Sequence, residues 1–280
     1  MTVTVQPETA VLRAVEATPW YQGRLGLLGA RLAVGVLLIA VWAIAAHLRL
    51  LPPEILPAPL DVLIAIFHLA VDPAFWLSFV VTLRAALISL GLAILIGVPV
   101  GLVLGMLPPV ERTTRFLMDL ARSFPVIALL PVMILLLGVT TEMEITVIVL
   151  GVVWPILVQT TYGSRRIDPV IRDTTKSYRI SVLLRFFKVV LPAASPFVMT
   201  GIRVASSVSI LIAIAVEILG RTQGMGFNLA NAQIDGASDI AIAYVFYAGA
   251  LGVSLNALLE LVEEKVIVWN ARGDRAGGRR

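Results

Sequence analysis

Six stretches of this sequence are apolar and long enough to cross a membrane, and they constrain the fold more than any other feature. About 20 apolar residues are needed to span the hydrocarbon core as a helix. In lipid the backbone N–H and C=O groups must bond within the segment, so each stretch is expected to be helical. The sequence therefore predicts an all-α polytopic membrane protein with six transmembrane helices near residues 27–48, 85–107, 116–138, 145–162, 198–219 and 240–260.

The composition excludes several classes of function. The chain is 59% hydrophobic and 14% charged, which is unlike a soluble domain. It has no cysteine, and its two histidines, His47 and His68, are far apart, so we expect no metal site. None of its three lysines follows the glycine of a phosphate-binding loop. We therefore expect no enzymatic activity and no cofactor in this chain, and no nucleic acid as a partner.

Positive charge is distributed unevenly between the two sides of the predicted spans. If the N-terminus is cytoplasmic, most Lys and Arg residues fall in cytoplasmic segments, and Arg49, Arg84 and Arg221 remain outside. The positive-inside rule then predicts that both termini are cytoplasmic. Residues 1–26 are expected to form a cytoplasmic tail, 27–269 the membrane domain and 270–280 a basic cytoplasmic tail.

Two spans carry residues that affect helix packing and continuity. Gly97, Gly101 and Gly105 recur every four residues in the second span, which predicts a ridge where another helix packs closely. Pro125 and Pro131 interrupt the third span, and each removes a backbone hydrogen-bond donor inside the membrane. Such breaks need a neighbouring helix or a wet cavity to satisfy the freed carbonyl groups.

Few polar side chains lie within the spans, and those few are the candidates for a translocation path. Glu217 is expected near the outer end of the fifth span, either as an interfacial carboxylate reaching water or as part of the path. Serines of the fifth span fit either a polar path or helix packing. The candidates are Arg122, which Asp119 can pair with from one turn earlier, Pro125, Ser206, Ser207 and Glu217.

The longest predicted cytoplasmic loop, about residues 163–197, holds the densest positive charge. Asp168 and Pro169 predict the start of a short helix, and Ser181 predicts a second short helix that Pro192 ends. Two short amphipathic helices meeting at a corner would form a rigid projection. The alternative is a basic loop that contacts anionic lipid.

Several motifs, taken together from about residue 50 to Trp269, resemble one family. They are LPAPLDVL, GVPVGLVLG, RSFPVIALLPVMILLLG, RRIDP and VEILGRTQGMGF, with a loop in which DTT, Arg179 and Leu191-Pro192 stand where the family has E-A-A-x-x-x-G and then L-P. The chain is similar to the permease subunit of bacterial ABC importers for nitrate, sulfonate, taurine, bicarbonate and related solutes.

The resemblance implies that the loop is a coupling helix that docks on a cytoplasmic ATPase subunit, where ATP and Mg²⁺ bind. It also implies a second permease, an extracytoplasmic solute-binding protein and a place in the bacterial inner membrane. We expect a homodimer, with a heterodimer as the alternative, and a small anion or sulfonate as the solute. The expected coupling residues are Asp173, Thr174, Thr175, Lys176, Tyr178, Arg179, Leu191 and Pro192.

The coupling motif departs from the family pattern. Where the family has glycine this chain has Arg179, and a side chain at positive φ costs about 1 kcal/mol, so we expect a different turn there. Two alternatives stay open. One is a non-transporting membrane anchor or assembly protein with a lipid-binding basic loop. The other is an ion-coupled transporter, against which the nearly uncharged span centres count.

Overall fold

A computed structural model describes residues 24–266, and every regular element in that range is helical. The expected tails at residues 1–26 and 270–280 lie almost wholly outside the described residues. The chain divides into two compact units, residues 1–59 and 60–280. The prediction of an all-α membrane protein is confirmed.

The first unit contains α1 (Arg24–His47), which covers the first predicted span. Residues Leu28–His47 have a mean hydropathy of 2.2 and the length to cross a membrane. After α1 the chain turns back, and Trp42 Nε1 donates a hydrogen bond of 3.0 Å to the Pro57 carbonyl oxygen. This bond holds the segment after α1 against the end of the helix.

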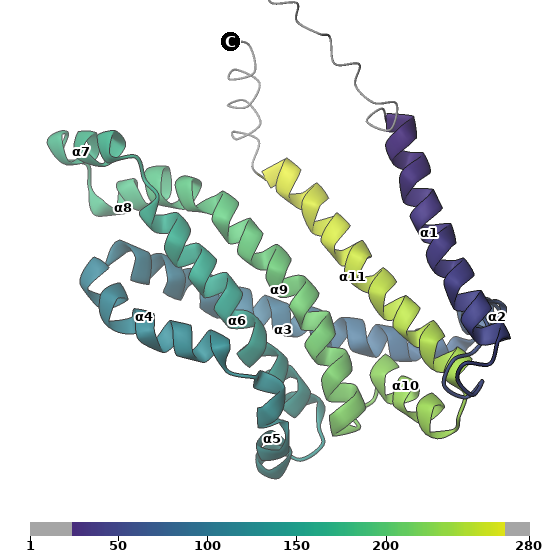
Figure 1. Cartoon of the computed structure of the whole chain (residues 1–280). Helices are drawn as coiled ribbons and strands as arrows, with labels where there is room; N and C mark the ends of the chain where they lie inside the picture. Colours follow the sequence, from purple (N-terminus) through teal and green to yellow (C-terminus); the bar gives the residue numbers. More distant parts are fainter. Residues whose placement is uncertain (1–23, 267–280) are drawn as a thin grey trace, which may run out of the picture. The chain divides into compact units, whose positions relative to one another are not determined.

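The second unit contains the remaining helices. They are α2 (Pro59–Val71), α3 (Pro73–Met106), α4 (Pro108–Ser123), the 3₁₀ turn η2 (Val126–Leu129), α5 (Leu130–Leu137), α6 (Thr141–Arg165), α7 (Pro169–Ser177), α8 (Val182–Arg185), the π turn η3 (Phe186–Val190), α9 (Leu191–Gly220), α10 (Met225–Ile234) and α11 (Ser238–Val266). In Figure 1, α6, α9 and α11 run as near-parallel diagonals while α3 crosses behind them.

Among the described residues, five helices are long and apolar enough to span a membrane, and a broken pair makes a sixth. The predicted interruption of the third span, 116–138, is confirmed at Pro125. The segments Thr113–Ser123 and Val126–Leu137 meet at 79°, and Pro125 lies at the break. Proline cannot donate to the preceding turn, so the helix ends there and restarts in a new direction.

The second predicted span begins earlier than its apolar window. Asp72 caps α3, since its Oδ1 accepts a 2.9 Å hydrogen bond from the Ala74 N–H, and Pro73 takes the first helical position. Both residues are typical of a helix start. The helix therefore extends 12 residues further toward the N-terminus than the window at 85–107.

The centre of the second unit is formed by α6, which packs against both α3 and α9. The predicted glycine ridge is confirmed, because Gly97, Gly101 and Gly105 are buried and face α6. A Cβ placed on Gly101 would lie 2.7 Å from the Thr160 Cβ and 2.9 Å from the Leu157 carbonyl oxygen. The backbones of α3 and α6 therefore touch along this ridge.

The contact between α6 and α9 also depends on small residues. A Cβ on Gly201 of α9 would lie 3.0 Å from the Gln159 Cβ and 3.1 Å from the Ile156 Cα. On the other helix, Gly163 of α6 receives the ring of Phe197. Helices whose small residues interlock in this way gain van der Waals contact that lipid does not provide.

The ridge generates a first prediction. Gly101→Ala forces the Thr160 and Leu157 contacts apart, and we expect it to lower the free energy of unfolding by about 1–3 kcal/mol. The matched control is Gly91→Ala on the same helix, where a Cβ meets nothing within 4 Å. Thermal unfolding of the purified chain in detergent measures both. Equal melting temperatures for the two variants would contradict the close contact.

Candidate functional site: coupling segment and membrane groove

Helix α7 begins as the sequence predicts. The Asp168 Oδ1 accepts a hydrogen bond of 2.8 Å from the Val170 N–H, and Pro169 occupies the first turn. In Figure 1, α7 projects past the ends of α6 and α9 at one end of the second unit, opposite α5 and α10. A short, capped helix in this position forms the predicted projection.

The end of α7 corrects the expectation for Arg179. This residue has φ of 50°, the left-handed conformation that favours glycine. The Ile180 N–H donates a hydrogen bond of 3.0 Å to the Thr175 carbonyl oxygen five residues earlier, which marks a Schellman cap. The prediction of a different turn is wrong: the chain keeps the glycine turn and bears the cost of a side chain there.

The second predicted helix begins correctly but does not end at Pro192. Ser181 Oγ accepts from the Leu184 N–H at 3.4 Å and caps α8. The chain then passes through the π turn η3 into α9, so Val182–Gly220 forms one helix of 39 residues. A widened turn before proline relieves the clash of its ring with the carbonyl four residues earlier. The projection is therefore α7 alone, followed directly by a span.

The predicted coupling residues fall into two groups. Asp173, Thr174, Tyr178 and Arg179 are exposed, and Tyr178 is 78% exposed. Thr175 is buried, at 5% exposed, and Leu191 and Pro192 are half-buried at the start of α9. The side chain of Lys176 lies outside the described residues. The role of all eight in coupling stays a prediction.

Two cavities lie along α4 and α6. The first, called here the basic cavity, has a volume of about 450 Å³ and is lined by Arg115, Met118, Asp119, Val158, Thr161, Tyr162, Arg165 and Arg166. The second, called here the middle cavity, has a volume of about 360 Å³ and is lined by Ala121, Arg122, Val126, Gly151, Trp154, Pro155, Val158, Gln159, Val204 and Val208. They share Val158 and together form a groove.

The predicted pairing of Arg122 with Asp119 is confirmed at 3.1 Å. Asp119 lines the basic cavity and Arg122 lines the middle cavity, so the ion pair stands at the boundary between them. Both side chains are about half exposed, at 55% for Arg122 and 53% for Asp119. Pro125, at the break, precedes Val126 of the middle cavity.

The two predicted serines differ in their surroundings. Ser206 is fully buried, and its Oγ donates a hydrogen bond of 2.8 Å to the Arg203 carbonyl oxygen. Ser207 is exposed, in the part of α9 that supplies Val204 and Val208 to the middle cavity. The geometry favours packing for Ser206, while Ser207 keeps its place as a candidate for the path.

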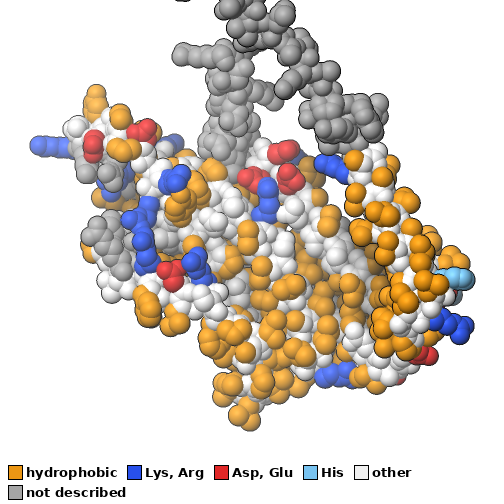
Figure 2. Space-filling view, in the orientation of Figure 1, with side chains coloured by type: hydrophobic (Ala, Val, Ile, Leu, Met, Phe, Trp, Pro, Cys, Tyr) orange, Lys and Arg blue, Asp and Glu red, His pale blue; other side chains and the backbone are white. Residues whose placement is uncertain are grey.

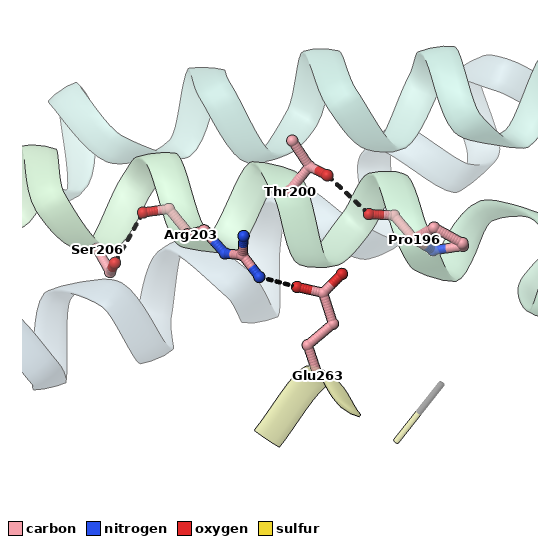
Figure 3. A network of polar contacts seen from close by, with 5 residues as sticks. All are labelled: Pro196, Thr200, Arg203, Ser206 and Glu263. Carbon is pink, nitrogen blue, oxygen red and sulfur yellow. Dashed lines mark hydrogen bonds and ion pairs between the residues drawn. The ribbon is translucent and has the colours of Figure 1, made fainter. Parts of the chain in front are cut away.

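The same region of α9 carries an ion pair that the sequence analysis missed. Figure 3 shows the Arg203 guanidinium meeting the Glu263 carboxylate across the gap between α9 and α11, beside the Thr200 and Ser206 bonds to their own helix. Glu263 stands in a Glu-Glu-Lys run that reads as an ordinary polar helix end. Only the three-dimensional contact identifies its partner.

Glu217 is fully buried, which excludes the interfacial alternative. Its Oε2 accepts a hydrogen bond of 2.7 Å from the Gly226 N–H, and the Thr82 Oγ1 accepts one of 2.9 Å from the Met225 N–H. The first two N–H groups of α10 therefore bond to side chains of α9 and α3. Unpaired N–H groups at a helix start favour a carboxylate.

The glycines of the VEILGRTQGMGF motif make room for this carboxylate. A Cβ on Gly226 would lie 2.8 Å from the Glu217 Cβ, and one on Gly224 would lie 2.6 Å from its Oε2. A second acid, Glu144 at the start of α6, is 2% exposed in the same core and was not among the predicted residues. Its place in the first turn of a helix gave no signal of burial.

The Arg179 turn generates a second prediction. Arg179→Gly removes the steric cost of a side chain at positive φ, about 1 kcal/mol, so the end of α7 becomes more stable. Hydrogen exchange at the Ile180 amide should slow about fivefold. The control Arg185→Gly, at a residue with φ of −60°, should speed exchange in α8. Faster exchange at Ile180 in Arg179→Gly would refute the turn.

The Glu217 contact generates a third prediction. Glu217→Ala leaves the Gly226 N–H buried without an acceptor, which costs about 1–3 kcal/mol of unfolding free energy. Glu217→Gln keeps an oxygen for this N–H and should cost less. Thermal unfolding measures both, with Glu142→Ala, an exposed acid at the start of α6, as control. An Ala variant as stable as the Gln variant would contradict the anchoring role.

Comparisons with known proteins agree with this architecture. Residues 93–268 match the family model described as binding-protein-dependent transport system inner membrane component. The chain is 27% identical to the taurine transport system permease protein of Escherichia coli K12, over 85% of this chain and 90% of that protein. It is 29% identical to the putative aliphatic sulfonates transport permease protein of the same organism, over 91% and 93%.

A third relative and a solved structure extend the comparison. The nitrate import permease protein of Leptolyngbya laminosa is 31% identical over 66% of this chain and 63% of that protein. A chain of the methionine ABC transporter MetNI, solved in inward-facing conformations, matches with a TM-score of 0.59 and 20% identity, over 70% of this chain and 97% of that chain. This last likeness concerns the fold alone.

The family match covers more than half of the chain and includes α6, α7 and α9, the helices that build the groove and its projection. Transport, and not membrane anchoring, is the function that this family shares. The chain belongs to the inner membrane components of binding-protein-dependent transport systems and is a multi-pass permease subunit of an ABC importer.

Proposed function

We propose that two copies of this permease form a path for a small anionic solute, and that a cytoplasmic ATPase docked on α7 opens and closes it. A solute-binding protein delivers the solute from outside. Both termini are cytoplasmic, and ATP with Mg²⁺ binds to the separate ATPase subunits. A heterodimer with a second kind of permease is the alternative assembly.

The surface of α7 and α8 carries the proposal for the ATPase. Tyr178, Val170 and Leu183 are 78%, 71% and 70% exposed on a segment next to the groove. Large apolar side chains left exposed along a short polar segment are candidates for contact with another protein. Because α8 continues through η3 into α9, a partner that contacts both α7 and α8 would move a transmembrane helix with them.

The groove supports the proposal of a second permease. Val204 and Val208 of α9 line the middle cavity, and on the same helix Val204 and Leu211 are 46% and 65% exposed. In a single copy, the donor groups of Arg122 and Gln159 in this cavity would face hydrocarbon, which is costly even though Arg122 pairs with Asp119. A second copy facing the first encloses the groove and supplies its other wall.

An anionic solute fits both the relatives and the groove. The relatives are named for taurine, aliphatic sulfonates and nitrate. In this chain, Arg122 and Gln159 bring donor groups to the middle cavity beside the apolar ring system of Trp154. A small anion that keeps part of its hydration would bind such a site weakly enough to leave it. The solute-binding protein would then set most of the specificity.

Transport then follows from two states of the dimer. ATP binding closes the ATPase pair, α7 moves with it, and the groove opens to the other side of the membrane. Each ligand shifts the equilibrium only as far as it prefers one state. Rigid-body movement of helix pairs about an interface is a common form of such a switch.

Co-purification tests the docking of the ATPase and gives a fourth prediction. An affinity-tagged native chain should retain an ATPase subunit in mild detergent, and Tyr178→Glu should lose it because a charge replaces a central apolar contact. The matched control is His68→Glu, an exposed position on α2 at the opposite end of the unit (Figure 1). Retention of the ATPase by Tyr178→Glu at native yield would refute docking on α7.

A further inference from the structure

The basic cavity combines positive charge with an apolar wall. Arg115 reaches it from α4, and Arg165 and Arg166 reach it from the end of α6; among the lining residues that the structure describes, Asp119 is the one acid. Figure 2 shows basic side chains gathered over this side of the molecule, with an acidic side chain among them. The wall between them is formed by Met118, Val158 and Tyr162.

Arg166 is held in place by an aromatic ring. Its guanidinium carbon lies 4.6 Å from the centroid of the Tyr162 ring, within the range of a cation–π contact. A cation–π contact uses the charge of the guanidinium over the ring face, and N–H groups remain for other acceptors. The N–H edge of a guanidinium matches two oxygens of a sulfonate, phosphate or carboxylate group. Because the Tyr162 ring already restricts the Arg166 side chain, this side chain loses less conformational freedom when an anion binds.

The helix dipole accounts for part of this arrangement but not for all of it. Cations are favoured at the C-terminal end of any helix, where Arg165 and Arg166 stand on α6. Arg115 is different, because it lies in the middle of α4 and still lines the same cavity. Convergence of three guanidinium groups from two helices on one space is the feature that points to an anion.

We propose that the basic cavity is an oxyanion-binding site, separate from the middle cavity, for a sulfonate or phosphate group attached to a short apolar part. The oxyanion pairs with Arg166 and its two neighbouring arginines, and the apolar part lies against Met118, Val158 and Tyr162. The shared chemistry has two sources, a free organic anion or the phosphate of a lipid headgroup. The inference rests on the proposed function only in placing this end of the groove in the cytoplasm.

The position of the site links it to both working parts of the permease. The Asp119–Arg122 ion pair separates it from the middle cavity. On the other side, two residues separate Arg166 from the first residue of α7, Pro169. An anion bound to Arg166 therefore lies next to the segment that leads into α7, and it competes with the Asp119 carboxylate for the nearby arginines.

Binding can be measured on the purified full chain in detergent after lipid removal. Ethanesulfonate is titrated at constant ionic strength, with chloride as the balancing anion, and the thermal unfolding midpoint is followed. We expect a saturable rise for the native chain and an apparent affinity at least about tenfold weaker for Arg166→Gln. The matched control is Arg221→Gln, because Arg221 also stacks on a ring, 4.7 Å from the Phe227 centroid, but lines neither cavity.

A second arm distinguishes the source of the anion. Native mass spectrometry counts phosphatidylglycerol molecules retained by the native chain, Arg166→Gln and Arg221→Gln from vesicles of phosphatidylglycerol and phosphatidylcholine. A sulfonate response that Arg166→Gln loses and Arg221→Gln keeps supports a site for a free anion. Loss of retained phosphatidylglycerol in Arg166→Gln alone, without a sulfonate response, supports a headgroup site.

The proposal is overturned if neither arm separates Arg166→Gln from Arg221→Gln. Co-purification of the ATPase with the native chain is recorded in the same preparations. An intact complex without anion binding would reject this site and leave the proposed function standing. Anion binding without a co-purified ATPase would support this site and reject the proposed function.

Discussion

The close approach of α3 and α6 along three glycines is the contact on which the rest of the structure depends. In lipid, helices gain little from leaving apolar surroundings, so association relies on tight packing. With Gly101 touching the backbone of α6, α6 becomes the central helix, and its other face is free to receive α9. The groove along α4 and α6 exists because this pair holds its position.

Around that pair, the sites of interest are places where a regular helix is interrupted. The third span breaks at Pro125 and bends by 79°, which brings Arg122 and Val126 to one cavity. The start of α10 is satisfied by Glu217 and Thr82 from other helices. At α10 the backbone N–H groups without helical partners bond to side chains, whereas the bend at Pro125 lies beside the middle cavity.

The sequence alone predicted the features that depend on residues close together in the chain. Spacing of four residues predicted the glycine ridge, Asp168 and Pro169 predicted the start of α7, and Asp119 predicted the partner of Arg122. It failed where the surroundings overrode a local preference. Arg179 adopts a glycine conformation because the cap of α7 requires it, and Pro192 is accommodated by a π turn.

Long-range contacts were beyond reach for a different reason. Glu217 looked like a carboxylate near a membrane surface, because nothing in its own helix reveals that α10 folds over it. The partnership of Arg203 with Glu263 and the convergence of three arginines on one cavity likewise join residues far apart in the chain. The family resemblance supplied the architecture, but not these contacts.

The continuity of α8, η3 and α9 has a mechanical meaning. A helix of 39 residues rises by about 1.5 Å per residue and is therefore roughly 58 Å long. A tilt of about 5° at one end of such an arm displaces the other end by about 5 Å, close to one helical turn. If the ATPase docks as proposed, a small swing of it becomes a movement large enough to change the width of a path. The π turn η3 is the one irregular stretch of this long helix. Bending there would reduce the displacement at the far end.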